Sequence, residues 1–318
     1  MSAVVEERVD DVEVGTTEVG TTEGAGHVAV TAAVEPEPSA FGLDRDDLRR
    51  IVRRGMLAFS AFVVGFLAFV LLGSALPHAR AQAGLQRRFE AELANAVAPV
   101  NDPIAAGRPI AVLDIPALGV HEVVVEGTTS AQLAKGPGHL RSSALPGQPG
   151  TSIVLCRRLA FGGPCRHLDR LEPGRRIVAT TGQGTVTYAV TGIERAAADD
   201  ARVFDHAGST LVLVTMDPPL FGSSRLVVRA EPVGDLQPRG TRAPAAPLDI
   251  DELGLAGDRS AAGILLVWLE VLAVLACGAV ILFRRWSRWP AYLVSAPPLL
   301  ACTWLVYEQL ARLLPATL

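Results

Sequence analysis

The side chains of this 318-residue chain whose chemistry depends most on spacing are its four cysteines, Cys156, Cys165, Cys277 and Cys302. They do not form two CxxC half-sites, so the sequence predicts no zinc cage, no other metal site and no cofactor. Cys277 and Cys302 lie in apolar runs, where a thiol usually behaves as a small buried hydrophobe. We therefore expect cysteine chemistry only at Cys156 and Cys165.

The composition points first to a membrane protein, because 49% of the residues are hydrophobic and the mean hydropathy is positive. Residues 55–76 are uncharged and apolar. A helix that rises about 1.5 Å per residue crosses the roughly 30 Å hydrocarbon core over such a length. Residues 261–283 and 289–310 are comparable runs. The sequence therefore predicts three transmembrane helices.

Arginines flank these runs on one side of the predicted membrane. Five of them, Arg45, Arg49, Arg50, Arg53 and Arg54, precede the first helix, and Arg284, Arg285 and Arg288 separate the other two. Positive residues favour the cytoplasmic side. We therefore expect a protein of the cell membrane with a cytoplasmic tail, with residues 77–259 outside, and with an extracytoplasmic C-terminal end.

Residues 1–44 are acidic, poor in aromatic residues and partly repetitive, so they are predicted to form a disordered cytoplasmic tail. The net charge of -4 gives no basic surface for nucleic acid, which we exclude as a partner. Residues 77–109 are predicted as a stalk helix and linker, because apolar residues recur there every four positions. Residues 232–260 are rich in Pro and Ala and are predicted as a second linker.

The segment 110–231 is predicted to be mainly β. Short β-branched runs separated by Gly and Pro cover residues 110–115, 120–126, 151–155, 176–181, 185–193, 210–215 and 225–230. Such regular short strands are typical of a closed β-barrel. The predicted fold is therefore an extracytoplasmic barrel of about seven to eight strands, carried by three transmembrane helices.

Several motifs in this segment resemble a known family. They are Lys-Gly-Pro-Gly-His at 135–139, Leu-Pro-Gly at 145–147, Ser-Ile-Val-Leu-Cys-Arg at 152–157, Phe-Gly-Gly-Pro at 161–164, Leu-Asp-Arg-Leu-Glu-Pro-Gly at 168–174, Leu-Val-Leu-Val-Thr-Met-Asp-Pro at 211–218 and Ser-Arg-Leu-Val-Val at 224–228. In this order they resemble the class E sortases, an actinobacterial type of membrane-anchored cysteine transpeptidase with a β-barrel domain.

The resemblance implies a site of one cysteine, one histidine and one arginine that cuts a sorting motif between Thr and Gly. The arginine is retained as Arg225, whereas Met216 stands at the family cysteine position and Cys156 at the histidine position. A thioether has no proton to lose and cannot form an acyl thioester. We therefore expect a degenerate site that is inactive as a transpeptidase.

Three states of Cys156 are open from the sequence. In an oxidising extracytoplasmic space it can form a disulfide with Cys165, because the eight intervening residues can close a loop. The two cysteines can instead be a pair of inert free thiols. As a free thiol beside Arg157, Cys156 could also act as a relocated nucleophile with a lowered pKa.

Two classes of function follow. The favoured one is a pseudo-sortase of the cell envelope, which binds sorting-motif peptides or other cell-surface proteins as a scaffold. The alternative is an active cysteine transpeptidase that uses Cys156 on sorting-motif proteins. The state of the Cys156 thiol distinguishes the two.

Overall fold

The computed structural model describes residues 45–101, 103–197, 200–204, 208–218, 224–241, 248, 250–253 and 257–318. The tail predicted over residues 1–44 lies outside this part of the chain. The chain divides after Arg54 into two units, and the unit that begins at Gly55 contains the barrel.

Among the described residues, three helical stretches are long and apolar enough to cross a membrane. The first comprises α1 (Arg45–Ala68), a five-residue π-helical segment η1 (Phe69–Gly73) and α2 (Ala75–Ala94), and the other two are α4 (Ala261–Arg285) and α5 (Arg288–Leu313). The prediction of three candidate spans is confirmed. The stretches predicted separately as span and stalk belong to one helical run, which is interrupted only near Ser74.

Aromatic side chains join α1 and η1 to α5. The Tyr307 ring lies 4.9 Å from that of Phe62, and its hydroxyl donates to the Phe62 carbonyl over 2.8 Å. Gly65 permits this approach, since a Cβ there would lie 2.6 Å from the Tyr307 oxygen. One helix turn further on, Phe69 and Trp304 meet edge to face at 4.9 Å. Within the second unit, α5 therefore packs firmly against the first span.

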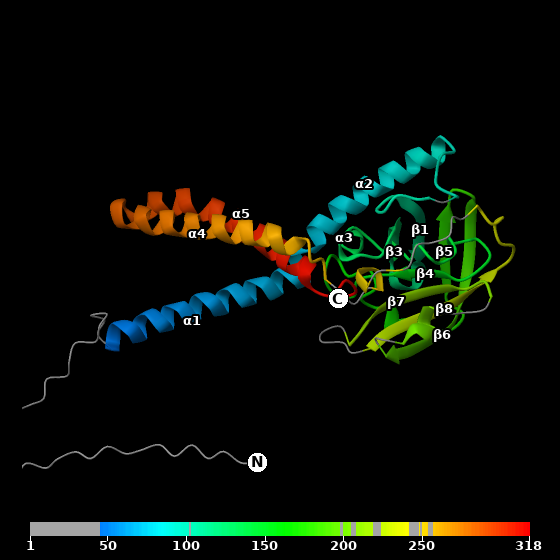
Figure 1. Ribbon diagram of the computed structural model, residues 1–318, viewed down its shortest axis with the longest axis horizontal. Coiled ribbons are helices and arrows are strands. Elements are labelled where there is room, and N and C mark those ends of the chain that lie inside the picture. The colour runs from blue at the N-terminus through cyan, green and yellow to red at the C-terminus, as the bar shows by residue number, and fades with distance from the viewer. Residues whose placement is uncertain are drawn as a thin grey trace, which may run out of the picture. The chain divides into compact units, whose positions relative to one another are not determined.

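The part of residues 109–233 that the structure describes forms a closed barrel of eight strands (Figure 1). They are β1 (Pro109–Ile115), β2 (Val120–Glu126), β3 (Gly138–His139), β4 (Ser152–Leu155), β5 (Arg176–Thr181), β6 (Gly184–Ala197), β7 (Leu211–Asp217) and β8 (Ser224–Val233). Their order around the barrel is β1-β2-β3-β4-β7-β8-β6-β5. The pairs β2–β3 and β4–β7 are parallel, and the others are antiparallel.

The predicted fold class is confirmed, and each of the seven β-branched runs overlaps a strand. The sequence did not indicate β3, because it is only two residues long and lies in a Gly-Pro-Gly-His run without β-branched residues. It nevertheless closes the sheet between β2 and β4.

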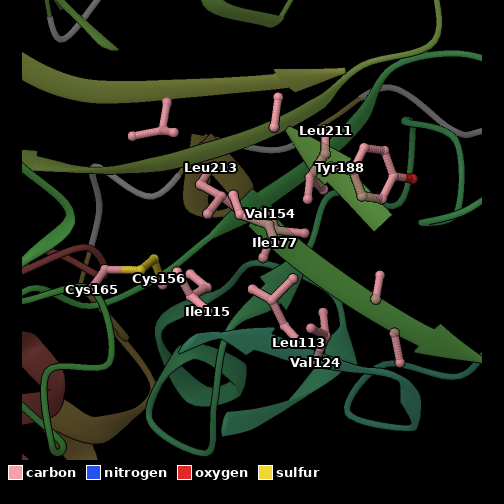
Figure 2. Close-up of a cluster of buried hydrophobic side chains, with 14 of the residues drawn as sticks. Leu113, Ile115, Val124, Val154, Cys156, Cys165, Ile177, Tyr188, Leu211 and Leu213 are labelled. Atoms are coloured by element: carbon pink, nitrogen blue, oxygen red, sulfur yellow. A yellow bond between two sulfur atoms is a disulfide. The ribbon is translucent and has the colours of Figure 1, made fainter. Parts of the chain in front are cut away.

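Side chains alternate between two apolar clusters on the two faces of the barrel wall. The interior cluster draws on every strand except β3. It includes Leu113, Ile115, Val124, Val154, Cys156, Ile177, Tyr188, Leu211 and Leu213 (Figure 2). The outer cluster comprises Leu133, Leu140, Ile153, Leu155, Val203, Val212, Val214, Val227 and Ala316. Tyr188 is the large polar side chain inside, and its hydroxyl accepts from the Gly147 amide over 2.7 Å.

Candidate functional site

The candidate site lies where β4 and β7 end beside the start of β8. Strands β4 and β7 are parallel, with Leu155 opposite Val214, so their carboxyl ends share one edge. Strand β8 returns antiparallel to β7 and places Arg225 directly opposite Met216. Two of the predicted site residues, Met216 and Arg225, are therefore brought together as a cross-strand pair.

The pair lies on the outer face of the barrel wall. In β7, Val212 and Val214 belong to the outer cluster, and Met216 follows with the same alternation. In β8, Arg225 precedes the outer-cluster residue Val227 by two positions. Both side chains are buried, with Met216 5% and Arg225 4% exposed. A methionine at this position supplies no ionisable group beside the arginine.

Cys156 lies on the other face. It belongs to the interior cluster and is joined to Cys165 by a disulfide, with the two Cα atoms 5.9 Å apart (Figure 2). Its amide donates to the Val214 carbonyl over 3.0 Å, and its carbonyl accepts from the Thr215 hydroxyl over 2.9 Å. The structure therefore does not bring the Cys156 side chain to Met216 and Arg225, and in the bridged state it offers no thiol.

Arg157 is the residue that the sequence reasoning missed. Its guanidinium donates to the Ser130 hydroxyl over 2.7 Å and lies 4.7 Å from the centre of the Phe161 ring. Ser130 begins the short helix α3 (Ser130–Leu133), whose Leu133 belongs to the outer cluster. Arg157 therefore extends to the face that carries Met216. The alternation of side chains along residues 153, 155 and 157 predicts that Arg157 lies on the same face as Ile153 and Leu155. The family motif instead aligned Cys156 with the histidine position.

Burial lowers the pKa of the Arg157 guanidinium to about 9, and the nearby charge of Arg312 acts in the same direction. The Arg157 side chain is completely buried, and its Nε and Nη1 atoms have no hydrogen-bond partner among the described residues. An arginine with unmatched donors at this depth is costly. It does not provide the proton transfer near neutral pH for which a histidine is suited.

Asp217, next to Met216, organises the charged end of the site. Its carboxylate accepts from Arg158 and, over 2.5 Å, from Nε of Arg195. Arg158 also donates to the Met216 carbonyl over 3.0 Å, which fixes the end of β7. Burial alone would raise the pKa of Asp217, but the hydrogen bonds and charges of Arg195 and Arg158 outweigh it and hold that pKa below its ordinary value.

The last residues of the chain lie against the same region. Ala316 belongs to the outer cluster together with Leu155 and Val214, and it is fully buried. The main-chain oxygen of Leu318 accepts from the amides of residues 158–160 over 3.2, 3.0 and 3.1 Å. A short turn of the chain itself, residues 315–318, therefore covers part of the outer face.

Histidine and metal chemistry find little support elsewhere in the described residues. His139 is completely buried, with Nδ1 2.8 Å from the Glu126 carboxylate and Nε2 2.8 Å from the Ala144 carbonyl. Both ring nitrogens thus face structural partners. Within the same part of the chain, no group of three or more His, Cys, Asp or Glu side chains could hold a metal ion.

Comparisons with known proteins agree with this architecture. Residues 113–233 match the family described as the sortase domain. Sortase D of Bacillus subtilis (strain 168) is 27% identical over 114 residues, which are 35% of this chain and 56% of that protein. The matched region thus spans little more than half of that relative.

Two solved structures are similar to the barrel. A Clostridium perfringens sortase D5 transpeptidase is 26% identical with a TM-score of 0.43. The matched region is 50% of this chain and 99% of that structure's chain. Sortase E from Streptomyces avermitilis is 31% identical with a TM-score of 0.38. The matched region is 41% of this chain and 91% of that structure's chain. The family match itself identifies residues 113–233, which contain the Met216 and Arg225 pair, as a sortase domain.

Proposed function

We propose that this protein is a pseudo-sortase: a membrane-anchored, extracytoplasmic sortase domain that binds sorting-motif peptides or other cell-surface proteins without cleaving them. The observation that carries the proposal is the Met216 and Arg225 pair, which keeps a cation on the outer face and puts a thioether where the resemblance calls for a thiol. Covalent catalysis needs a nucleophile that can form an acyl intermediate.

Peptide binding is supported by the segment at the end of the chain. Residues 315–318 form a turn against the outer face, and their main-chain oxygens accept hydrogen bonds from the amides of residues 158–160. A face that holds one short segment through backbone contacts has the chemistry to hold another. Arg225 supplies a donor for a peptide carbonyl or carboxylate at the same strand ends.

The alternative, a transpeptidase that uses Cys156, is weakened by two observations. The sulfur is bridged to Cys165, and the side chain belongs to the interior cluster rather than to the face of Arg225. A nucleophile there would need a reductant and a path through the barrel wall. No described contact supplies either.

The catalytic part of the proposal is tested with the detergent-solubilised full chain and a fluorescent sorting-motif peptide. We expect saturable binding by fluorescence anisotropy and no cleavage product by chromatography. Arg225→Gln should weaken binding by about tenfold or more, because a hydrogen bond from a charged group is worth about 1.5–3 kcal/mol. Arg229→Gln, four residues along the same strand, is the matched control. Cleavage by the unaltered protein would overturn the pseudo-sortase proposal.

The same proposal includes the membrane topology, with residues 1–44 cytoplasmic and both the barrel and the C-terminal end outside. The arginine clusters favour it. The contact between Leu318 and residues 158–160 agrees with it, because α4 and α5 together return the chain to the side from which it came. In intact cells, Ser2→Cys should resist an impermeant thiol reagent and Thr241→Cys should react. The reverse labelling would refute this orientation.

A further inference from the structure

The segment that follows α5 leaves the helix abruptly. Leu314 adopts an extended conformation, with φ -66° and ψ 156°, and Pro315 has no amide hydrogen with which to continue the helical ladder. Before the exit, the Ser130 hydroxyl donates to the carbonyl of Arg312 over 2.9 Å and ties the helix end to α3. The residues beyond leave the helix and form a turn, in which the Leu318 amide donates to the Pro315 carbonyl over 3.0 Å.

Residues 315–318 are held mainly through their backbone. The Leu318 oxygen accepts from three successive amides, those of Arg158, Leu159 and Ala160, and the Thr317 oxygen accepts from the Arg158 amide over 3.2 Å. Successive N–H groups that converge on one oxygen form a nest of the kind that binds carbonyl and carboxylate oxygens. We call residues 158–160 the amide nest.

The side chains of the segment are small or aliphatic and are enclosed. Ala316 is fully buried in the outer cluster, whereas Thr317 and Leu318 are 4% and 7% exposed. The methyl group of Ala316 fills the space between its neighbours in the outer cluster, so a larger or charged side chain at position 316 would displace them. The outer face is thus selective for a small residue two positions before the one held in the nest.

The amide nest is built by its own loop and does not depend on the segment for its shape. The Cys156–Cys165 disulfide closes the loop, and the Cys165 amide donates to the Arg157 carbonyl over 3.1 Å. Within it, Gly163 adopts a φ of 54°, and a Cβ there would lie 2.6 Å from the Arg158 oxygen. A preformed loop of this kind presents its donors whether or not a ligand is present.

We infer that the amide nest and the outer cluster form a peptide-binding site, and that residues 315–318 are its intramolecular ligand, exchangeable for a peptide that carries the same small and aliphatic side chains and can adopt the same turn. The inference rests on the proposed peptide-binding function and names the site and its resident occupant. The attachment of the segment to α5 supplies a high effective concentration. A free peptide therefore competes only weakly until the segment is displaced.

The test follows amide hydrogen exchange at residues 158–160 in the full chain, resolved by mass spectrometry. Ala316→Asp should expel the segment and speed exchange of these amides at least tenfold, while amides of β5 and β6 keep their protection. Ala105→Asp, the same change at an exposed position, is the control and should leave exchange unchanged. A synthetic Leu-Pro-Ala-Thr-Leu peptide, added at millimolar concentration to Ala316→Asp, should restore protection of the nest.

Unchanged protection in Ala316→Asp, or loss that the peptide does not reverse, would overturn the inference and make the segment a fixed part of the fold. If β5 and β6 also lose protection, replacement of residues 315–318 by Gly-Ser-Gly-Ser decides the question by the same two criteria. Binding of a sorting-motif peptide that is equal in the wild type and in Ala316→Asp would sink the inference alone. Absence of such binding in both would sink the proposed function.

Discussion

The interior and outer faces of the barrel wall differ in the side chains that they carry. The interior cluster consists of apolar side chains from nearly every strand, and it includes the Cys156–Cys165 disulfide. The outer face at the ends of β4, β7 and β8 carries Met216, Arg225 and a buried Arg157, and it is completed by α3 and by residues 315–318. The interior maintains the fold, whereas the outer face carries the Met216 and Arg225 pair on which the pseudo-sortase proposal rests.

This difference shows why neighbouring residues in one motif have unrelated roles. Cys156 and Arg157 are adjacent, yet alternation sends the first into the core and the second toward α3. A change at Cys156 therefore acts on stability, and a change at Arg157 acts on the chemistry of the outer face.

The sharpest contrast is expected from two attempts to restore catalysis. Met216→Cys with Arg157→His places a thiol and an imidazole on the face of Arg225, and a covalent adduct with a sorting-motif peptide should appear within hours by intact mass. Met216→Cys with Cys156→His should remain at the wild-type background, because its imidazole lies inside the barrel and the disulfide is lost. An adduct in the second variant alone would refute the assignment of faces.

Truncation of one leucine on each face compares their packing. Leu213→Ala in the interior cluster should cost about 3–5 kcal/mol of unfolding free energy, since strands of a closed barrel cannot collapse into the cavity. Leu140→Ala in the outer cluster should cost only about 2 kcal/mol, because α3 and residues 315–318 can shift. Every tryptophan lies in α4, α5 or the turn between them, so pulse proteolysis in urea is the suitable measurement. Equal costs would show that both faces are equally rigid.

Removal of the disulfide should have a smaller effect. Cys156→Ala with Cys165→Ala should lose about 2–3 kcal/mol, the range expected for a short closed loop. Reduction of the wild type should produce the same loss, and the reductant should leave the double variant unchanged. A wild type that is insensitive to reduction would argue against a structural role for the bridge.

The smallest effect concerns Asp217→Asn, which removes an acceptor shared by Arg158 and Arg195 and should cost about 1–2 kcal/mol near pH 7. Because the pKa of Asp217 is held below its ordinary value, the ionised carboxylate stabilises the fold above about pH 4. This contribution is lost as pH falls through the lower folded-state pKa. A stability difference between wild type and variant that stays the same from pH 7 down to pH values below the folded-state pKa would contradict the ion-pair assignment.

The fold could be predicted from the sequence because its signals are local. Strand alternation, apolar helix length and glycine punctuation each depend on a few neighbouring residues, and they indicated every strand except β3. The family motifs indicated Met216 and Arg225 as candidate site residues, and the register of β7 and β8 pairs them. The face of Cys156 required the register of β4, and the docking of residues 315–318 joins segments more than 150 positions apart, for which no local pattern exists.

The account stands most directly on the absence of a usable thiol in the barrel, and one mass measurement tests it. After incubation with a sorting-motif peptide, the full chain should show no peptide adduct. When then denatured without reductant and alkylated, it should gain two alkyl groups, on Cys277 and Cys302, and after reduction it should gain four. A peptide-sized adduct that maps to Cys156, or four alkyl groups without reduction, would contradict the pseudo-sortase account.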